Sequence, residues 1–126
     1  MHCYKIVPVN GFTRTTVEGA LDVGSSAAML RQVAADARVR GHHLLLDLRD
    51  AEASGLSYSD VYRLVGMLAG HPHALLNRIA LLDTFRPGFE KVQFFQASAT
   101  DQGFEVRAFL DEAAAVRWLS EVEPVA

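Results

Sequence analysis

This chain of 126 residues lacks the features that mark secreted, membrane-spanning and nucleic-acid-binding proteins. It has one cysteine, Cys3, which excludes an internal disulfide and suits a reducing compartment. No run approaches the roughly 20 apolar residues of a membrane span, and the N-terminal segment MHCYKIVPVNG has no apolar signal-peptide core. The net charge of -3 provides no basic surface for a nucleic-acid backbone. We therefore expect a cytoplasmic protein with no nucleic-acid partner and no integral membrane segment.

The sequence also lacks the usual signatures of cofactor binding and catalysis. No glycine-rich phosphate-binding loop follows a predicted strand, and no nucleophile, base and orienting residue occur together at a known spacing. A zinc site needs three or four converging ligands. The histidine pairs His42-His43 and His71-x-His73 each lack an obvious third ligand. We therefore expect no cofactor, no metal and no catalytic residue.

What the chain does contain is an alternation of apolar strands and amphipathic helices. Its hydrophobic content of 50% is that of an ordinary globular domain, and its length suits one domain over residues 1–126. The runs Leu44–Leu48 and Ile79–Leu82 are almost continuously apolar, which is typical of strands buried on both faces in the middle of a sheet.

Shorter patterns flank these two central strands. Residues Tyr4–Val9 and Phe12–Glu18 surround the turn signal Asn10-Gly11 and predict a hairpin. Residues Phe104–Leu110 alternate in polarity and predict an edge strand. Helices are expected from a cap at Ser25-Ser26 to Gly41, from Ser57 to Gly70, from Pro87 to Gly103, and over Ala113–Leu119. The second of these opens with Ser57-x-x-Asp60, which is related to the capping box but has Asp in place of the usual Glu. The chain is thus predicted to be an α/β protein with a single mixed, mostly parallel sheet of about five strands, in an order close to sequence order, and about four helices.

Several segments together resemble the SpoIIAA-like branch of STAS-type domains. The similar segments are VEGALDV after the hairpin, the run HLLLDLRD, the strand RIALL and the ending EVRAFLDEAAAVRWL. The resemblance implies a sheet with helices wound along it, and a non-enzymatic regulatory module that binds a protein partner. The partner is unidentified, and a homodimer through the first strand or the phenylalanine-rich helix is an alternative mode of association.

The resemblance also implies a site. Regulatory STAS domains carry a phosphorylated Ser or Thr between an Asp-Leu strand end and a Gly-Leu helix start. Asp47-Leu48 and Ser54-Gly55-Leu56 are similar to these motifs, but Ala53 stands where the family has Asp and the intervening loop is shorter. Ser54 is accordingly the candidate phosphorylation position, and a docking surface is expected around Arg49, Asp50, Leu56, Tyr58, Tyr62 and Arg63.

The residues leave two other functions open. A helix with more phenylalanines than one buried stripe needs could border a pocket for a small apolar or lipid-like ligand, although core packing of all four is the simpler interpretation; these residues are Phe85, Phe89, Phe94 and Phe95. Asp47, Asp50 and Asp83 are predicted at the ends of two central strands, where α/β proteins bind ligands. They could act as acid and base in a small hydrolase, or simply pair with Arg49 and Arg86.

Overall fold

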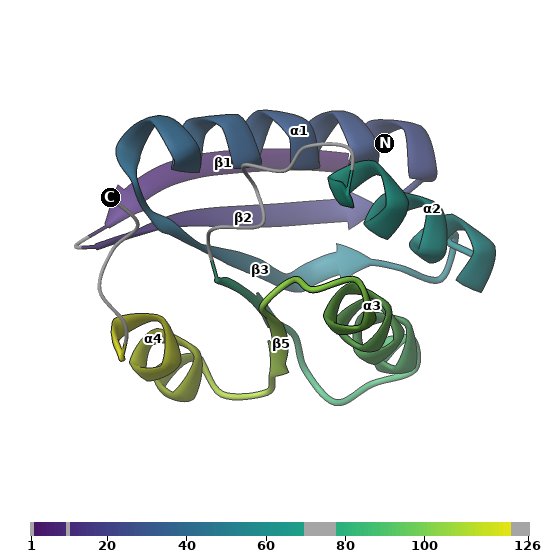
Figure 1. The fold of residues 1–126 in the computed structure, drawn as a ribbon. Helices are drawn as coiled ribbons and strands as arrows, with labels where there is room; N and C mark the ends of the chain where they lie inside the picture. Colours follow the sequence, from purple (N-terminus) through teal and green to yellow (C-terminus); the bar gives the residue numbers. More distant parts are fainter. Residues whose placement is uncertain (1, 10, 70–77, 122–126) are drawn as a thin grey trace.

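The structure, a computed structural model, describes residues 2–9, 11–69 and 78–121. These residues form one mixed five-stranded sheet with four helices (Figure 1). In chain order the elements are β1 (His2–Val9), β2 (Phe12–Ala20), α1 (Val23–Arg40), β3 (His43–Glu52), α2 (Tyr58–Ala69), β4 (Ile79–Leu82), α3 (Phe89–Asp101), β5 (Val106–Phe109) and α4 (Glu112–Ser120).

The strands lie side by side in the order in which they occur in the sequence, from β1 to β5. β1 and β2 pair antiparallel as the predicted hairpin, whereas β2 to β5 pair in parallel. β3 and β4 occupy inner positions because their apolar runs need cover on both faces, and every residue of β4 is buried. The predicted fold class and strand order are therefore confirmed.

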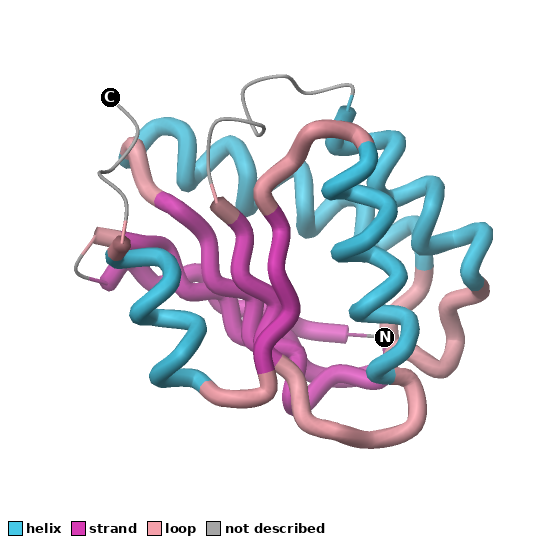
Figure 2. The backbone as a smooth tube through the Cα atoms, turned by 60° about the horizontal axis from the view of Figure 1, so that its bottom comes forward, coloured by secondary structure: helices cyan, strands magenta, loops and turns pink. Residues whose placement is uncertain are grey.

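Helices cover the two faces of the sheet unequally. α1, α2 and α3 pack on one face, against apolar side chains of the strands. α4 packs on the other face, over β3, β4 and β5, around a small core that includes Leu45, Leu82 and Trp118 (Figure 2). None of the helices within the described ranges is long and apolar enough to cross a membrane.

β3 is longer than the predicted strand Leu44–Leu48, since it runs on to Glu52. Its pairing with β4 ends at Asp47, but its pairing with β2 continues to the end of the strand. A register shift after Asp47 leaves one extra residue in β3 relative to β2. The prediction missed this second half because a segment paired on one side only need not be a continuous apolar run.

The predicted cap of the first helix at Ser25-Ser26 is wrong. α1 begins at Val23, and Asp22 caps it. The Asp22 Oδ1 atom accepts the backbone N–H of Ser25 at 2.8 Å, and the Asp22 carbonyl accepts that of Ser26 at 3.0 Å. Aspartate is as good an N-cap as serine, so the helix starts at the earlier of two capping residues.

The start of α2 follows the predicted capping pattern. The Ser57 hydroxyl accepts the backbone N–H of Asp60 at 3.0 Å, and the Asp60 carboxylate accepts the backbone N–H of Ser57 at 3.0 Å. The helix then buries a single apolar stripe, formed by Val61, Leu64, Val65 and Leu68. Local sequence therefore determines both where this helix begins and which face it turns to the core.

We predict that Ser57→Ala lowers the free energy of unfolding by about 1 kcal/mol, because the N–H of Asp60 loses its acceptor. Ser59→Ala, at an exposed position in the same helix, is the matched control and should cost less than about 0.5 kcal/mol. Urea denaturation of both variants measures the difference. Equal stability of the two would contradict the capping role.

Candidate functional site

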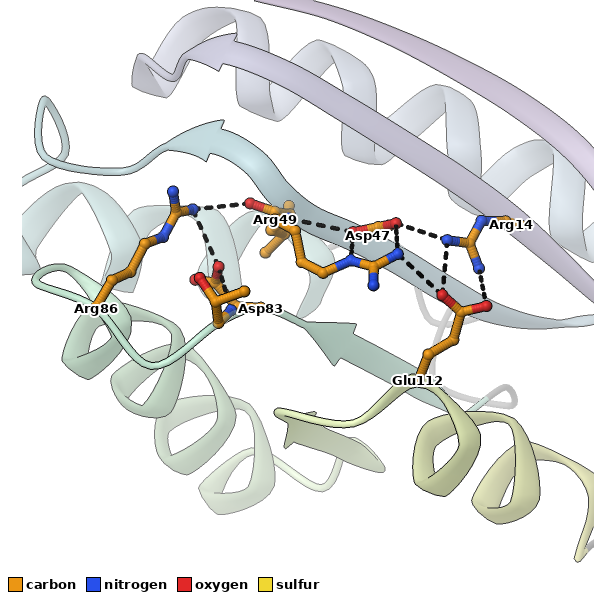
Figure 3. A network of polar contacts seen from close by, with 8 residues as sticks. Arg14, Asp47, Arg49, Asp83, Arg86 and Glu112 are labelled. Carbon is orange, nitrogen blue, oxygen red and sulfur yellow. Dashed lines mark hydrogen bonds and ion pairs between the residues drawn. The ribbon is translucent and has the colours of Figure 1, made fainter.

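An ionic network on the α4 face of the sheet joins three elements (Figure 3). Asp47 of β3 is buried. Its carboxylate accepts hydrogen bonds from Arg49 Nε and Nη2 at 2.9 and 2.7 Å, and from Arg14 Nη2 of β2 at 2.6 Å. Glu112, the first residue of α4, accepts from Arg49 at 2.9 Å and from Arg14 at 3.3 Å. Two arginines and two carboxylates therefore tie β2, β3 and α4 together.

The arginines keep Asp47 ionised inside the protein. Burial by itself would raise the pKa of this carboxyl, but the hydrogen bonds from Arg49 and the charges of Arg49 and Arg14 outweigh it. The pKa of Asp47 therefore lies below its ordinary value of 3.8. A carboxylate held in this way is a fixed acceptor for its neighbours and does not act as an acid near neutral pH.

A second ion pair stands at the end of β4. Asp83 is buried and lies 3.0 Å from Arg86. Burial raises the pKa of Asp83 above 3.8, although the N–H of Thr84 and the charge of Arg86 oppose the shift. Arg86 also donates to the carbonyl oxygens of Leu48, at 2.9 Å, and of Ala51. Both carbonyls lie beyond the last residue of β3 that pairs with β4, so Arg86 supplies donors where β4 no longer does.

This geometry favours structural roles for the carboxylates that were candidates for acid–base chemistry. Asp47 lies within β3 rather than at its end, because the strand continues to Glu52. Asp47 and Asp83 each face at least one arginine, and Asp50 is exposed. Asp47 and Asp83 are therefore explained as ion-pair partners of arginines, and neither burial requires a bound substrate.

Ser54, the candidate phosphorylation position, is exposed in a turn between β3 and α2. The ammonium of Lys91, on α3, lies 3.4 Å from the carbonyl oxygens of Ala53 and Ser54. On the other side the turn approaches the start of α1, since a Cβ atom at Gly55 would lie 3.2 Å from the carbonyl oxygen of Leu21. The turn is therefore held between α1 and α3 while the Ser54 side chain faces solvent.

Exposed aromatic side chains follow this turn on α2. Tyr58 and Tyr62 are 48% and 57% exposed. The Tyr58 ring meets that of Phe94, on α3, edge to face with ring centroids 5.1 Å apart. Together with Ser59 and Arg63, these three residues line a shallow hollow on the surface. We call this set the α2–α3 aromatic patch.

Two residues of the predicted docking surface lie elsewhere. Leu56 is 5% exposed and belongs to the core, because the turn folds it under α2. Arg49 lies in the ionic network on the opposite face of the sheet from α2. Asp50 remains exposed, and Tyr58, Tyr62 and Arg63 do come together in the patch.

The four phenylalanines do not share one environment, so core packing of all four is wrong. Phe89 and Phe95 are buried, whereas Phe94 is half-buried beneath Tyr58. Phe85 is 86% exposed, because it precedes α3 in a loop. A cavity does lie beside α3, but of these four residues it is Phe95 that lines it.

Three residues of the site were missed by reasoning from the sequence. Arg14 could have been noticed because it lies on the more exposed side of β2, in a visible polar and apolar alternation. Glu112 could have been noticed as an acidic residue in the first turn of its helix. Lys91 carried no comparable signal. Their partners are distant in the sequence, as with Arg14 and Glu112, which are 98 residues apart.

The histidines form no metal site within the described part of the chain. His71 and His73 lie outside the described residues. Within the described ranges, no group of three His, Cys, Asp or Glu side chains is placed to hold a metal ion.

We predict that Asp47→Asn lowers the free energy of unfolding by about 2 kcal/mol, because it leaves Arg14 and Arg49 with an uncompensated positive charge. Part of that charge stays in contact with solvent and with Glu112, which limits the loss. Asp50→Asn, on the same strand but exposed, is the control and should be nearly neutral. Chemical denaturation at neutral pH measures both, and similar effects of the two variants would contradict the network's role.

The pKa of Asp83 is shifted upward and that of Asp47 downward, so the two carboxyls should affect stability with opposite dependences on pH. Because its pKa is raised above 3.8, the folded chain keeps a proton that the unfolded chain has already lost, so stability falls as the pH rises through the raised pKa. Asp83→Asn removes this effect. Its stability relative to the wild type should therefore increase between about pH 4 and pH 7.

Denaturant titrations across this pH range test the prediction for Asp83. Asp50→Asn, measured in parallel, corrects for the general loss of one negative charge. A stability difference between Asp83→Asn and wild type that stays constant, or that decreases as the pH rises, would contradict it.

Comparison with known proteins shows a likeness of fold. No family model matches this sequence, and no curated protein matches it closely enough to count as a relative. An anti-sigma factor antagonist from Mycobacterium paratuberculosis superimposes with a TM-score of 0.61 at 16% identity, over 96% of each chain. An uncharacterised protein with a SpoIIAA-like fold from Shewanella loihica gives a TM-score of 0.58 at 15% identity, over 94% of this chain and 93% of the other. The chain therefore has the SpoIIAA-like fold that its resemblance to STAS-type domains predicted.

Proposed function

We propose that this chain is a non-enzymatic regulatory module that acts by binding a protein partner. The observation that carries the proposal is the α2–α3 aromatic patch, which is exposed beside the turn that holds Ser54. The fold supports it, since one protein of this fold is named an anti-sigma factor antagonist, which describes an action on other proteins. The buried carboxylates of Asp47 and Asp83 are paired with arginines, which accounts for their presence without an acid–base function.

The chemistry of the patch suits a protein interface. Tyrosine and arginine are enriched among the residues that dominate binding energy, because they offer large contact areas and polar ends. Tyr58 is held against Phe94, so less side-chain freedom is lost when a partner covers it. Tyr62 and Arg63 extend the surface along α2.

Ser54 is the position where phosphorylation would act on this surface. A phosphate adds about two negative charges and three strong acceptors. The ammonium of Lys91 already reaches the carbonyl oxygen of Ser54. Phosphorylation would therefore change both the charge of the docking surface and the contacts that hold the turn.

The test is an affinity capture that compares matched variants. We expect the wild-type chain to retain a protein whose recovery falls by about ten-fold or more with Tyr62→Asp, as for a residue central to an interface. Leu110→Asp is the control, since Leu110 is 52% exposed but lies between β5 and α4. Ser54→Glu, which places a negative charge in the turn, should also change recovery.

The captured protein is then purified and titrated against each variant by calorimetry. Loss of affinity with Tyr62→Asp but not with Leu110→Asp would support the proposal. If every recovered protein binds all four chains equally, the proposed docking surface is wrong.

A further inference from the structure

β1 forms one open edge of the sheet (Figure 1). Within the described residues no strand pairs with its outer side, and its 8 residues make it longer than β5, the 4-residue strand at the other edge. An edge strand presents unpaired backbone N–H and C=O groups, which can pair with a strand of another chain. The outer side of β1 is therefore a surface on which a further strand can add to the sheet.

The outward-facing backbone groups of β1 belong to alternate residues, because an antiparallel strand directs successive residues to opposite neighbours. Val9 is the last residue before the two-residue turn of the hairpin, so its groups bond to β2. Pro8 has no N–H, and proline is tolerated in a strand where its nitrogen faces away from the ladder. Both observations turn the N–H and C=O groups of His2, Tyr4 and Ile6 outward.

We propose that two copies of this chain form a symmetric dimer in which their β1 strands pair antiparallel, centred on Tyr4. In this register Tyr4 lies opposite Tyr4 of the second copy, and His2 lies opposite Ile6. Each outward N–H then meets a C=O, and Pro8 stays outside the paired segment. The dimer is a role independent of the proposed partner binding.

Lys5 and Pro8 exclude the neighbouring registers. Proline and lysine on an edge strand normally block pairing, and here their positions leave one register open. Centring the pair on Ile6 would place Pro8 opposite Tyr4, where its missing N–H loses hydrogen bonds. Centring it on Lys5 would place the two ammonium groups directly opposite each other, where like charges repel.

Charged side chains on the sheet face away from α1 complement one another in the Tyr4-centred register. Lys5 is exposed and lies opposite Cys3 of the second copy, which pairs with Glu18 in its own hairpin. Glu18 is exposed two strands away, at about 10 Å, and the long Lys5 side chain can reach it across the small Cys3. Asp50, the register partner of Glu18 in β3, is also exposed. The ammonium therefore meets an acidic surface, and the two-fold symmetry makes this contact twice.

The other face of the joined sheets has room for both copies of α1. This helix contacts β1, β2 and β3, so its axis lies near β2, one strand inward from the edge. The two axes are then about three strand spacings, or about 14 Å, apart, whereas packed helices lie about 8–10 Å apart. The Tyr4 hydroxyl donates to Gln32 of its own α1, so this side chain is held against the helix and leaves the edge accessible.

Sedimentation velocity of the full chain under reducing conditions tests for the dimer. We expect the sedimentation coefficient to rise from that of a monomer to that of a dimer between about 1 and 500 µM, by mass action. Lys5→Glu, and likewise Glu18→Lys, should raise the dissociation constant about ten-fold, because each opposes like charges at two symmetric contacts. Combining both substitutions should restore the dimer. Arg117→Glu, at an exposed position of α4, is the matched charge control and should have no effect.

Disulfide trapping tests the register. Cys3 of the wild type lies diagonal to its copy, with Cα atoms about 8 Å apart, beyond the roughly 7 Å that a disulfide spans. Lys5→Cys places a thiol directly opposite Cys3 of the second copy, at about 4.5 Å between Cα atoms, so mild oxidation should give a covalent dimer on a non-reducing gel. Lys5→Cys combined with Cys3→Ser should stay monomeric on the gel. Val7→Cys, exposed on the same face, should also stay monomeric, because it faces Cys3 only in the Lys5-centred register.

Three results would overturn the proposal. The first is a wild-type chain that sediments as a monomer over the whole concentration range. The second is a dimer that Lys5→Glu and Glu18→Lys leave unchanged, which would place the contact on another surface. The third is trapping by Val7→Cys instead of Lys5→Cys. Tyr62→Asp, which tests the α2–α3 aromatic patch, should leave the dimer intact, so the two proposals can fail separately.

Discussion

The rest of the structure depends on the way β3 pairs with its two neighbours. It pairs with β4 only as far as Asp47, where β4 ends at Leu82, but with β2 as far as Glu52, so the last residues of β3 have a neighbouring strand on one side only. Backbone carbonyls of β3 beyond the end of β4 need other donors, and Arg86 donates to those of Leu48 and Ala51 from the loop after β4. Each candidate site described above lies at or beside this end of the sheet.

The charges of the ionic network balance one another around one buried carboxylate, that of Asp47. Asp47, Arg14, Arg49 and Glu112 neutralise one another across β2, β3 and α4. Buried ion pairs add little net stability relative to apolar packing, yet they cost much when one partner is removed. Such a network fixes the position of α4 on the sheet, which apolar contacts around Trp118 alone would specify less sharply. It also pairs Asp47, which was a candidate for acid–base catalysis, with two arginines.

The turn before α2 has two sides with different properties. Its outer side presents Ser54 to solvent next to the α2–α3 aromatic patch, whereas Ala53 and Leu56 form part of the cavity wall beneath. Lys91 contacts the turn and also lines the cavity.

The sequence by itself determined the fold class, the strand order and the capping of α2, because burial on both faces and local hydrogen bonding leave patterns within short segments. Tertiary structure alone decided that Arg14 reaches Glu112, that Leu56 is buried, and that the Ser26 hydroxyl is buried without a hydrogen-bond partner. These outcomes depend on contacts between elements far apart in the chain. Such contacts are selected by packing geometry in three dimensions and leave no periodic trace in the order of the amino acids.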